Sequence, residues 1–389
     1  MAPSKGFCGG GERSCKKVVE TINKPSEPFC SGVLRALGDF TGDMRPWGDW
    51  IWGIRLIDYI LRGVAQVMFV NNSLSGLLIL GGLFLQNPWW ALNGLLGTTI
   101  STVSAIALRD AVSAGLHGYN GTLVGILMSV FSAKGDWYLW LFVPNVFLCT
   151  LCPVVSSALS AITTKWDVPI FTLPFNILIC LHIAATGATH PFFSQVCWET
   201  NSGRRNTSWH NTDLHAVFLS VPVGVGQVFG CDNPWTGGVI LLALLLCSPT
   251  ICFHAILGSA AGLALATPHT DVYSGLWGYN SVLSCIAIGG VFYALTWQTH
   301  ILALTCAFFC AYASSATSKL MSVLSLPACT WPFCLSTLIF LLLSSERPAL
   351  RRLPLAAVSY PEENRRYLRR LKKRMVSPHM CPSCFLSAV

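Results

Sequence analysis

The sequence predicts an all-α polytopic membrane protein that consists of two inverted repeats. Hydrophobic residues make up 53% of the 389 residues and charged residues 11%, whereas the charged share of soluble proteins is near 25%. Between residues 63 and 345 only 13 of 283 residues are charged, and residues 274–318 contain none. Three sequence blocks also recur in the second half at a nearly constant offset. A soluble chain would need very large dry cores to bury such a centre, so a membrane accounts for it better.

Both ends of the chain are polar and are expected in the cytoplasm. The first 30 residues contain no apolar stretch of the kind found in a signal peptide. Residues 346–389 carry ten Lys or Arg and three Asp or Glu, and the cytoplasmic segments of membrane proteins are enriched in Lys and Arg. The basic excess therefore reports on membrane topology, and no nucleic-acid partner is expected.

Twelve apolar runs fill the centre, six in each half. The first six lie near residues 51–70, 74–86, 89–108, 119–133, 137–162 and 170–189. The second six lie near residues 214–229, 235–247, 249–267, 279–295, 297–317 and 326–344. A helix needs about 20 residues to cross a hydrocarbon core of roughly 30 Å, so the shorter runs predict segments that span only part of the membrane.

Charged residues and cysteines beside or within these runs are expected to be structural. Lys165 and Asp167 end a run next to Trp166, which is typical of anchors at the membrane interface. Ten cysteines lie inside apolar runs, where they are expected to behave as small buried residues. Cys381 and Cys384 form a lone CxxC pair without further ligands, so no metal site is predicted.

The internal repeat consists of three pairs of blocks. They are Gln66–Gly76 with Gln227–Gly237, Gly115–Ile126 with Gly275–Ile286, and Val168–Phe175 with Leu326–Phe333. The offsets are 161, 160 and 158 residues, and the central pair is identical at seven of twelve positions. Blocks that keep both order and spacing indicate that the halves are duplicates.

Topology predicts how the halves are oriented. Asn206 begins an Asn-Thr-Ser sequon in the polar linker, and a glycosylated asparagine faces the exterior. With both ends inside and the linker outside, each half crosses an odd number of times. Six runs then give five transmembrane helices and one re-entrant pore helix per half, with a central pore in each protomer. The predicted segments are 1–43 (cytoplasmic N-terminal segment), 44–194 (first membrane repeat), 195–213 (extracellular linker), 214–345 (second membrane repeat) and 346–389 (basic cytoplasmic tail).

The repeated polar residues indicate the kind of solute. The blocks contain the pairs Gln66 and Gln227, Asn120 and Asn280, and Thr172 and Thr330. They contain no paired carboxylate or histidine, whereas ion pathways usually show an intramembrane charge. Asp232 is the charge expected to lie deepest, and its Asn-Pro context favours a helix cap over ion coupling. A neutral polar solute therefore fits best.

Thr172 and Thr330 each lie between two prolines. Prolines lack amide donors, so they interrupt a helix and are expected to leave carbonyl oxygens free. A hydroxyl beside free carbonyls suits a small molecule with several N–H donors and one carbonyl. The alternative is a pair of kinked helices whose threonines bond to their own chains, and the symmetric recurrence favours the solute site.

The two Pro-x-x-Thr-x-Pro-Phe motifs around Thr172 and Thr330, the two Gly-Tyr-Asn blocks and the tail segment from Tyr360 closely resemble the urea transporters of vertebrates. The resemblance runs from about Met44 into the tail, and Val168 stands where the family signature has Leu. It implies passive, channel-like facilitated diffusion of urea and close analogues across the plasma membrane. It also implies a homotrimer in membrane lipid, with one pore per protomer, no cofactor and no catalytic residue.

On matching positions the resemblance implies seven residues in contact with substrate. They are Thr172 and Thr330 in the narrow middle, Leu123 and Leu283 as apolar constrictions beside them, Gln66 and Gln227 at the two ends, and Phe193 as one wall of an aromatic slot. A planar solute between apolar faces, with acceptors along its edge, loses little on dehydration, whereas an ion finds no compensating charge. Transport is expected to run downhill.

Two other functions stay open at this point. A channel for ammonia or water also fits a neutral pore, although an ammonium channel would predict a pore histidine pair, and His182, His254 and His300 are not related by the repeat. A membrane enzyme would need clustered acids or a nucleophile beside a base. The one such cluster, between His210 and His215, lies in the polar linker.

Overall fold

The computed structural model describes residues 41–44, 52–108, 115–132, 135–186, 214–266, 274–343 and 349–375. Within these ranges the regular elements are helices, as predicted, and an isolated bridge pairs Tyr293 with Arg352. The chain divides into two compact units. The larger unit, Phe40–Asn364, contains helices α3 to α14 and the start of α15, and the smaller combines Met1–Asp39 with Arg365–Val389.

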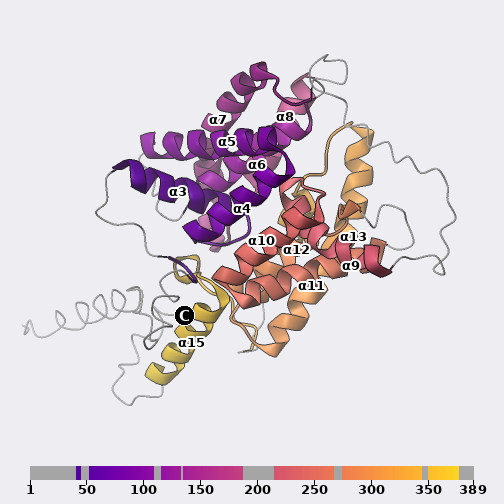
Figure 1. The fold of residues 1–389 in the computed structure, drawn as a ribbon. Helices are drawn as coiled ribbons and strands as arrows, with labels where there is room; N and C mark the ends of the chain where they lie inside the picture. Colours follow the sequence, from indigo (N-terminus) through magenta and orange to yellow (C-terminus); the bar gives the residue numbers. More distant parts are fainter. Residues whose placement is uncertain are drawn as a thin grey trace, which may run out of the picture. The chain divides into compact units, whose positions relative to one another are not determined.

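The first half of the larger unit runs from α3 to α8, coloured indigo to magenta (Figure 1). Its helices are α3 (Trp52–Gln66), α4 (Ser73–Gln86), α5 (Pro88–Ala107), α6 (Gly118–Val130), α7 (Phe142–Thr163) and α8 (Leu173–Thr186). Short 3-10 turns at Leu139–Leu141 and Thr164–Trp166 extend α7 at its two ends. Each helix lies in one of the six apolar runs predicted for this half.

The second half runs from α9 to α14. Its helices are α9 (Leu214–Gly226), α10 (Pro234–Cys247), α11 (Pro249–Ala266), α12 (Tyr279–Ile286), α13 (Trp297–Val323) and α14 (Trp331–Leu341). A 3-10 turn at Gln227–Phe229 follows α9, and a π-helical turn at Ala287–Val291 follows α12. The tail adds a 3-10 turn at Leu355–Ala357 and helix α15 (Pro361–Met375). Here too, each predicted apolar run contains a helix.

The second helix of each half begins with the same cap. Asn72 caps α4 and its repeat equivalent Asn233 caps α10, in each case by accepting hydrogen bonds from amides of the first turn. The prediction that Asp232 caps α10 is wrong, because its exposed carboxylate instead accepts a hydrogen bond from Gln86 Nε2 at 2.8 Å. The sequence context indicated a cap correctly, but the neighbouring Asn233 provides it.

Glycines let the first two helices of each half fold back on one another. A Cβ at Gly76 would overlap the Leu61 carbonyl oxygen, and a Cβ at the equivalent Gly237 would overlap the Pro222 carbonyl oxygen. In the second half α9 and α10 are bent by 78°. Both halves therefore depend on a glycine at the same position for the same close approach.

Equivalent positions also share an unusual backbone conformation. Left-handed φ angles occur in four repeat-related pairs: Phe69 (61°) with Gly230 (74°), Gly115 (71°) with Gly275 (70°), Asp167 (52°) with Ser325 (54°), and Phe171 (49°) with Cys329 (41°). Non-glycine residues rarely adopt this region. The duplication seen in the sequence is therefore present in the local backbone of both halves.

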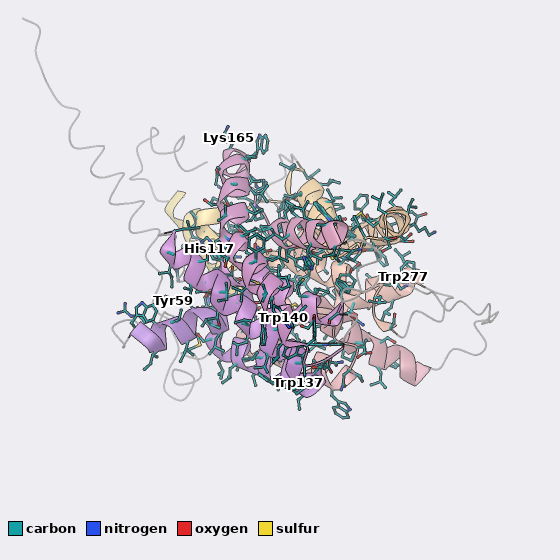
Figure 2. All side chains as sticks on the ribbon, turned by 90° about the horizontal axis from the view of Figure 1, so that it is seen from above. Tyr59, His117, Trp137, Trp140, Lys165 and Trp277 are labelled. Atoms are coloured by element: carbon teal, nitrogen blue, oxygen red, sulfur yellow. The ribbon has the colours of Figure 1, made fainter. Side chains whose placement is uncertain are left out.

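In the described part of the chain, two helices are long and apolar enough to span a membrane by length and composition, Leu139–Trp166 and Trp297–Val323. The bent pair α9 and α10 would provide a third if it counts as one span, and several shorter apolar helices accompany them. Figure 2 shows Trp137 and Trp140 at one end of α7 and Lys165 at the other. Aromatic and basic residues at opposite ends of a long apolar helix are typical of anchors at the two membrane interfaces.

The cysteines within the predicted apolar runs are free thiols. Cys180 is half-buried, and the other nine are buried: Cys149, Cys152, Cys247, Cys252, Cys285, Cys306, Cys310, Cys329 and Cys334. Among the described residues no group of three or more His, Cys, Asp or Glu side chains is arranged to hold a metal ion. The thiols therefore serve as small packing residues inside the bundle.

Candidate functional site

The structure brings the two repeated threonines into contact. Thr172 Oγ1 and Thr330 Oγ1 lie 2.6 Å apart although 158 residues separate them in sequence. Both threonines are buried, with 4% and 3% of their surface exposed. Each is placed by the irregular turn that precedes a helix, α8 for Thr172 and α14 for Thr330. The duplicated motifs therefore converge on one point between the halves.

The residues four positions after each threonine complete this centre. Asn176 Oδ1 accepts hydrogen bonds from Thr330 N and from Thr330 Oγ1, each at 3.0 Å. The repeat equivalent of Asn176 is Cys334, whose Sγ lies 3.3 Å from Thr172 Oγ1. Each hydroxyl thus contacts the helix of the other half, through an amide on one side and a thiol on the other.

The carbonyl oxygens just before the threonines are not free, contrary to the prediction. The Tyr119 hydroxyl donates to the Phe171 carbonyl oxygen. In the second half, the Tyr279 hydroxyl at 2.7 Å and Asn280 Nδ2 at 3.2 Å donate to the Cys329 carbonyl oxygen. The tyrosines of the two Gly-Tyr-Asn blocks therefore fix these turns, and Phe171 O keeps a second lone pair for another donor.

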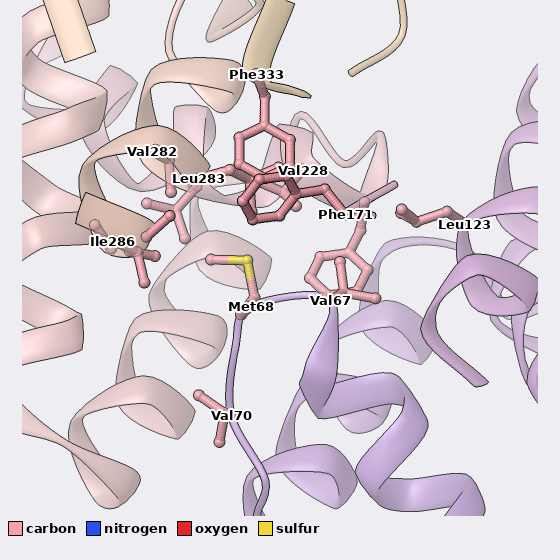
Figure 3. Close-up of a cluster of buried hydrophobic side chains, with 14 of the residues drawn as sticks. Val67, Met68, Val70, Leu123, Phe171, Val228, Val282, Leu283, Ile286 and Phe333 are labelled. Atoms are coloured by element: carbon pink, nitrogen blue, oxygen red, sulfur yellow. The ribbon is translucent and has the colours of Figure 1, made fainter. Parts of the chain in front are cut away.

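Apolar side chains surround the threonine pair symmetrically. Leu123 and Leu283 are each 1% exposed, and the repeat-related Val67 and Val228 are each 3% exposed. All four belong to one buried cluster. In Figure 3 the loop that carries Val67 and Met68 runs between Leu123 on one side and Leu283 on the other. The two hydroxyls therefore lie in apolar, buried surroundings.

An aromatic cluster that the sequence did not indicate lies next to this centre. The rings of Phe69, Phe171, Phe292 and Phe333 pack edge to face, with centroids 4.9 to 6.1 Å apart. The sequence assigned an aromatic wall to Phe193, which lies outside the described residues. Phe69 could have been found, because it stands three positions after Gln66 in a repeated block.

The two glutamines occupy equivalent, half-buried positions. Gln66 ends α3, and Gln227 begins the 3-10 turn after α9. Gln227 Nε2 donates to the Ser274 carbonyl oxygen at 2.8 Å. Each glutamine directly precedes a buried valine of the apolar shell. In each half a half-buried amide group therefore lies next in sequence to the buried apolar centre.

Two charged or titratable pairs were missed in the sequence. Asp58 and Arg62 form a fully buried ion pair in α3. His254 and His300 lie side by side with nearly parallel rings, ring centroids 4.9 Å apart and Nδ1 of His300 3.0 Å from Nε2 of His254. The spacing of Asp58 and Arg62, four residues apart in an apolar run, was a visible signal. The histidine pair was not, because 46 residues separate its members.

The remaining residues of interest lie outside what the structure describes. Asn206 of the sequon, His210 and Asp213 fall in the linker, and the side chain of His215 is likewise not described. In the part that the structure describes, the two threonine hydroxyls are hydrogen-bonded to each other inside an apolar shell. None of the described groups that contact them is charged.

Comparison with known proteins gives one family. A family model described as urea transporter matches residues 57–345. Rat Urea transporter 1 is 52% identical over 354 residues, which cover 88% of this chain and 92% of the rat protein. Urea transporter 1 of the mouse matches to the same extent, and that of the sheep is 49% identical over 353 residues, with the same coverage.

Proposed function

We propose that urea passes between the two halves of this chain at the Thr172–Thr330 pair. The chain belongs to the urea transporter family. It is therefore a multi-pass membrane protein that carries urea by facilitated transport. It is not an enzyme, and the family does not favour a channel dedicated to ammonia or water. The observation that carries the proposal is the 2.6 Å contact between two repeat-equivalent hydroxyls inside an apolar shell.

The threonine pair acts in this proposal as a narrow, dry centre. Without solute each hydroxyl satisfies the other, so neither is left unpaired. A urea molecule that enters separates them and replaces the lost bond by bonds from its own N–H groups, which keeps the net cost small. An ion would lose its hydration shell among Leu123, Leu283, Val67 and Val228 without any charged partner, and is therefore excluded.

The other implied contacts extend the pathway in both directions. Gln66 and Gln227 are the amide groups at its two ends, where their half-buried side chains exchange hydrogen bonds between water and solute. Leu123 and Leu283 form the constrictions beside the threonines. Phe193 provides one wall of an aromatic slot. This pathway is supported by the matching order of residues in the two halves. Each half has a glutamine, then a buried valine and then a threonine: Gln66, Val67 and Thr172, and Gln227, Val228 and Thr330.

The pathway implies the inverted-repeat topology. We propose five transmembrane helices and one re-entrant pore helix in each membrane repeat, 44–194 and 214–345, with cytoplasmic ends 1–43 and 346–389. The linker 195–213 is then extracellular and its Asn206 is glycosylated. The 78° bend between α9 and α10, the short apolar helices and the shared left-handed turns support this arrangement.

We also propose that the protein works as a homotrimer in the lipid of the plasma membrane, with one pore per protomer. Large apolar side chains are exposed on the longest helices: Phe147 is 63% exposed on α7 and Tyr312 is 76% exposed on α13. Lipid chains and neighbouring protomers are the surroundings that suit such faces.

Purified protein in liposomes tests the transport mode. Urea flux should follow the urea gradient alone and should not change when a membrane potential or an ion gradient is imposed. A flux that required an ion gradient would exclude the passive mechanism. Cysteine labelling at positions 66 and 227 tests the topology. If the repeats are inverted, a membrane-impermeant reagent should label one position from the outside and the other from the inside. Labelling of both positions from one face would rule out the inversion.

A further inference from the structure

The buried ion pair in α3 is not explained by the pathway described so far. Arg62 Nε lies 3.0 Å from Asp58 Oδ2, and neither side chain has any exposed surface. Charges inside a membrane bundle are costly, and they are kept where they bind further groups or support function. The repeat does not require the pair, because the equivalent positions in the second half are Leu219 and Val223.

Arg62 holds the backbone that follows its own helix. Its Nη1 donates to the Asn71 carbonyl oxygen at 3.2 Å, to Asn71 Oδ1 at 2.8 Å and to the Met44 carbonyl oxygen at 2.8 Å. Asp58 accepts a hydrogen bond from the Ser73 hydroxyl. The ion pair therefore fastens the start of α4 to the last two turns of α3, across the non-helical residues 67–72.

The short segment before α3 completes this attachment. Met44 N donates to the Asn71 carbonyl oxygen at 3.2 Å, and Asn72 Nδ2 donates to the Gly42 carbonyl oxygen at 2.9 Å. Gly42 N in turn donates to the carbonyl oxygen of Cys247, the last residue of α10, at 3.0 Å. Asp58, Arg62 and residues 42–44 are called the clamp below.

Phe69 lies within the stretch 67–72 that the clamp holds, and its backbone conformation is unfavourable. Its φ of 61° lies in the left-handed region, which is unfavourable for a residue with a large side chain. Its repeat equivalent is Gly230, with φ of 74°, and glycine adopts this conformation without steric cost. The half with a phenylalanine at this position has the buried ion pair, and the half with a glycine has two apolar residues instead.

The unfavourable backbone conformation of Phe69 places its ring among three other phenylalanine rings. Its ring centroid lies 6.1 Å from that of Phe171, 5.9 Å from that of Phe292 and 6.1 Å from that of Phe333. Phe171 directly precedes Thr172. A glycine at position 69 would remove the strain and the ring together, so the clamp makes an aromatic wall possible beside the threonine pair.

We propose that Arg62 is a positioning residue for urea transport: with Asp58 and residues 42–44 it holds Phe69 in the conformation that forms the aromatic wall. The proposal rests on the pathway proposed above. It assigns a specificity role to a residue that does not itself touch the solute, and it explains why the two repeats differ at positions 58, 62 and 69.

A double-mutant cycle between Arg62→Lys and Phe69→Gly tests the coupling. The readout is the ratio of urea to N-methylurea permeability of the full-length protein in liposomes. Lysine keeps the charge beside Asp58 but cannot reach Asp58, Asn71 and Met44 together. Each single variant should lower the ratio about three- to tenfold, because a displaced ring excludes the larger solute less well. In the Phe69→Gly background Arg62→Lys should change the ratio by less than about twofold, since interacting residues are not additive.

A matched control is available in Arg352→Lys. The Arg352 guanidinium also donates to a backbone carbonyl, that of Trp166 at 3.2 Å, and lies 3.8 Å from a carboxylate oxygen of Asp167, but it is partly exposed. This variant should leave the permeability ratio unchanged. If Arg62→Lys does not give folded protein, Asp58→Asn combined with Arg62→Gln removes both buried charges together and enters the same cycle.

The outcomes separate the clamp from the pathway. If Arg62→Lys lowers the ratio by the same factor with Phe69 and with glycine at that position, Arg62 is merely structural and the proposal is overturned. If Phe69→Gly leaves the ratio unchanged while Thr172→Val still slows urea, the pathway holds and the clamp has no role in specificity. If neither Phe69→Gly nor Thr172→Val affects urea, the pathway itself is wrong.

Discussion

Removing one hydroxyl from the threonine pair is the most direct test of the proposed pathway. Thr172→Val and Thr330→Val each conserve side-chain volume and delete one hydroxyl. In Thr172→Val, Thr330 Oγ1 keeps its bond to Asn176 Oδ1 at 3.0 Å. In Thr330→Val, Asn176 Oδ1 keeps its bond from the backbone amide of residue 330 at 3.0 Å, and the Thr172 hydroxyl loses its partner at position 330 but stays 3.3 Å from Cys334 Sγ. The cost to folding should therefore be about 0.5–1.5 kcal/mol, that of one ordinary hydrogen bond.

The effect on transport is the difference between two opposing contributions. A dehydrated urea that loses one hydrogen-bonding partner is destabilised by about 1–3 kcal/mol. The variant also lacks the 2.6 Å bond between the hydroxyls, which no longer has to be broken when urea enters, and this offsets about 0.5–1.5 kcal/mol. With central values of about 2 and about 1 kcal/mol for the two contributions, the net rise in the barrier is about 1 kcal/mol, which corresponds to a urea flux about fivefold lower.

Stopped-flow urea efflux from liposomes, normalised to the amount of folded protein, measures this change. Water permeability serves as the internal reference, since water can reorient its own hydrogen bonds and should be affected less. The double variant need not be additive, because both hydroxyls serve one solute molecule. Two well-folded single variants that carry urea at the unmodified rate would show that the threonines are ordinary kink residues.

Three further predictions concern packing, folding and pH. Leu123→Ala should destabilise the protein by about 2–5 kcal/mol and lower the ratio of urea to thiourea flux, which thermal unfolding and efflux measure; an unchanged ratio would remove Leu123 from the constriction. Gly76→Ala should lower the melting temperature, because its Cβ would overlap the Leu61 carbonyl oxygen, whereas Gly81→Ala in the same helix meets nothing within 4 Å and should not; equal effects would refute the close approach. Burial raises the pKa of Asp43 from 3.8 to about 6, so its protonated form is favoured in the folded state; stability should fall as pH rises from about 4 through 6, and Asp43→Asn should flatten that profile in detergent unfolding.

Much of the architecture could be predicted because it depends on two features that are visible in the sequence, the apolar runs and the repeated blocks. Apolar runs require no knowledge of tertiary contacts, and a helix lies in each of the twelve. The constant offset of the blocks identified Thr172 and Thr330 as equivalent, and the structure places their hydroxyls in contact. Equivalent residues on duplicated halves can meet on a shared axis, so the repeat carried long-range information that single motifs lack.

The features that were missed or mistaken depend on which atoms meet in three dimensions. Asn-Pro after Asp232 indicated a cap, but only the backbone direction decides whether residue 232 or 233 faces the first turn. Prolines indicated free carbonyls near Thr172, but the Tyr119 hydroxyl, 52 residues away from Phe171, takes one of them. The clamp on Phe69 is visible only once left-handed φ angles are known.

The hydrogen-bond directions at the centre show that the two threonines are not interchangeable. The Asn176 atom that meets Thr330 must be its oxygen, because Thr330 N can only donate, so the Thr330 hydroxyl donates its proton to the same oxygen. Thr172 is then the donor in the bond between the hydroxyls. In Thr330→Val, the freed Thr172 proton can turn toward the urea carbonyl and restore a bond. In Thr172→Val, the Thr330 proton stays on Asn176 and only an acceptor is left. Thr172→Val should therefore slow urea more than Thr330→Val, and the opposite order in the efflux assay would contradict this direction of donation.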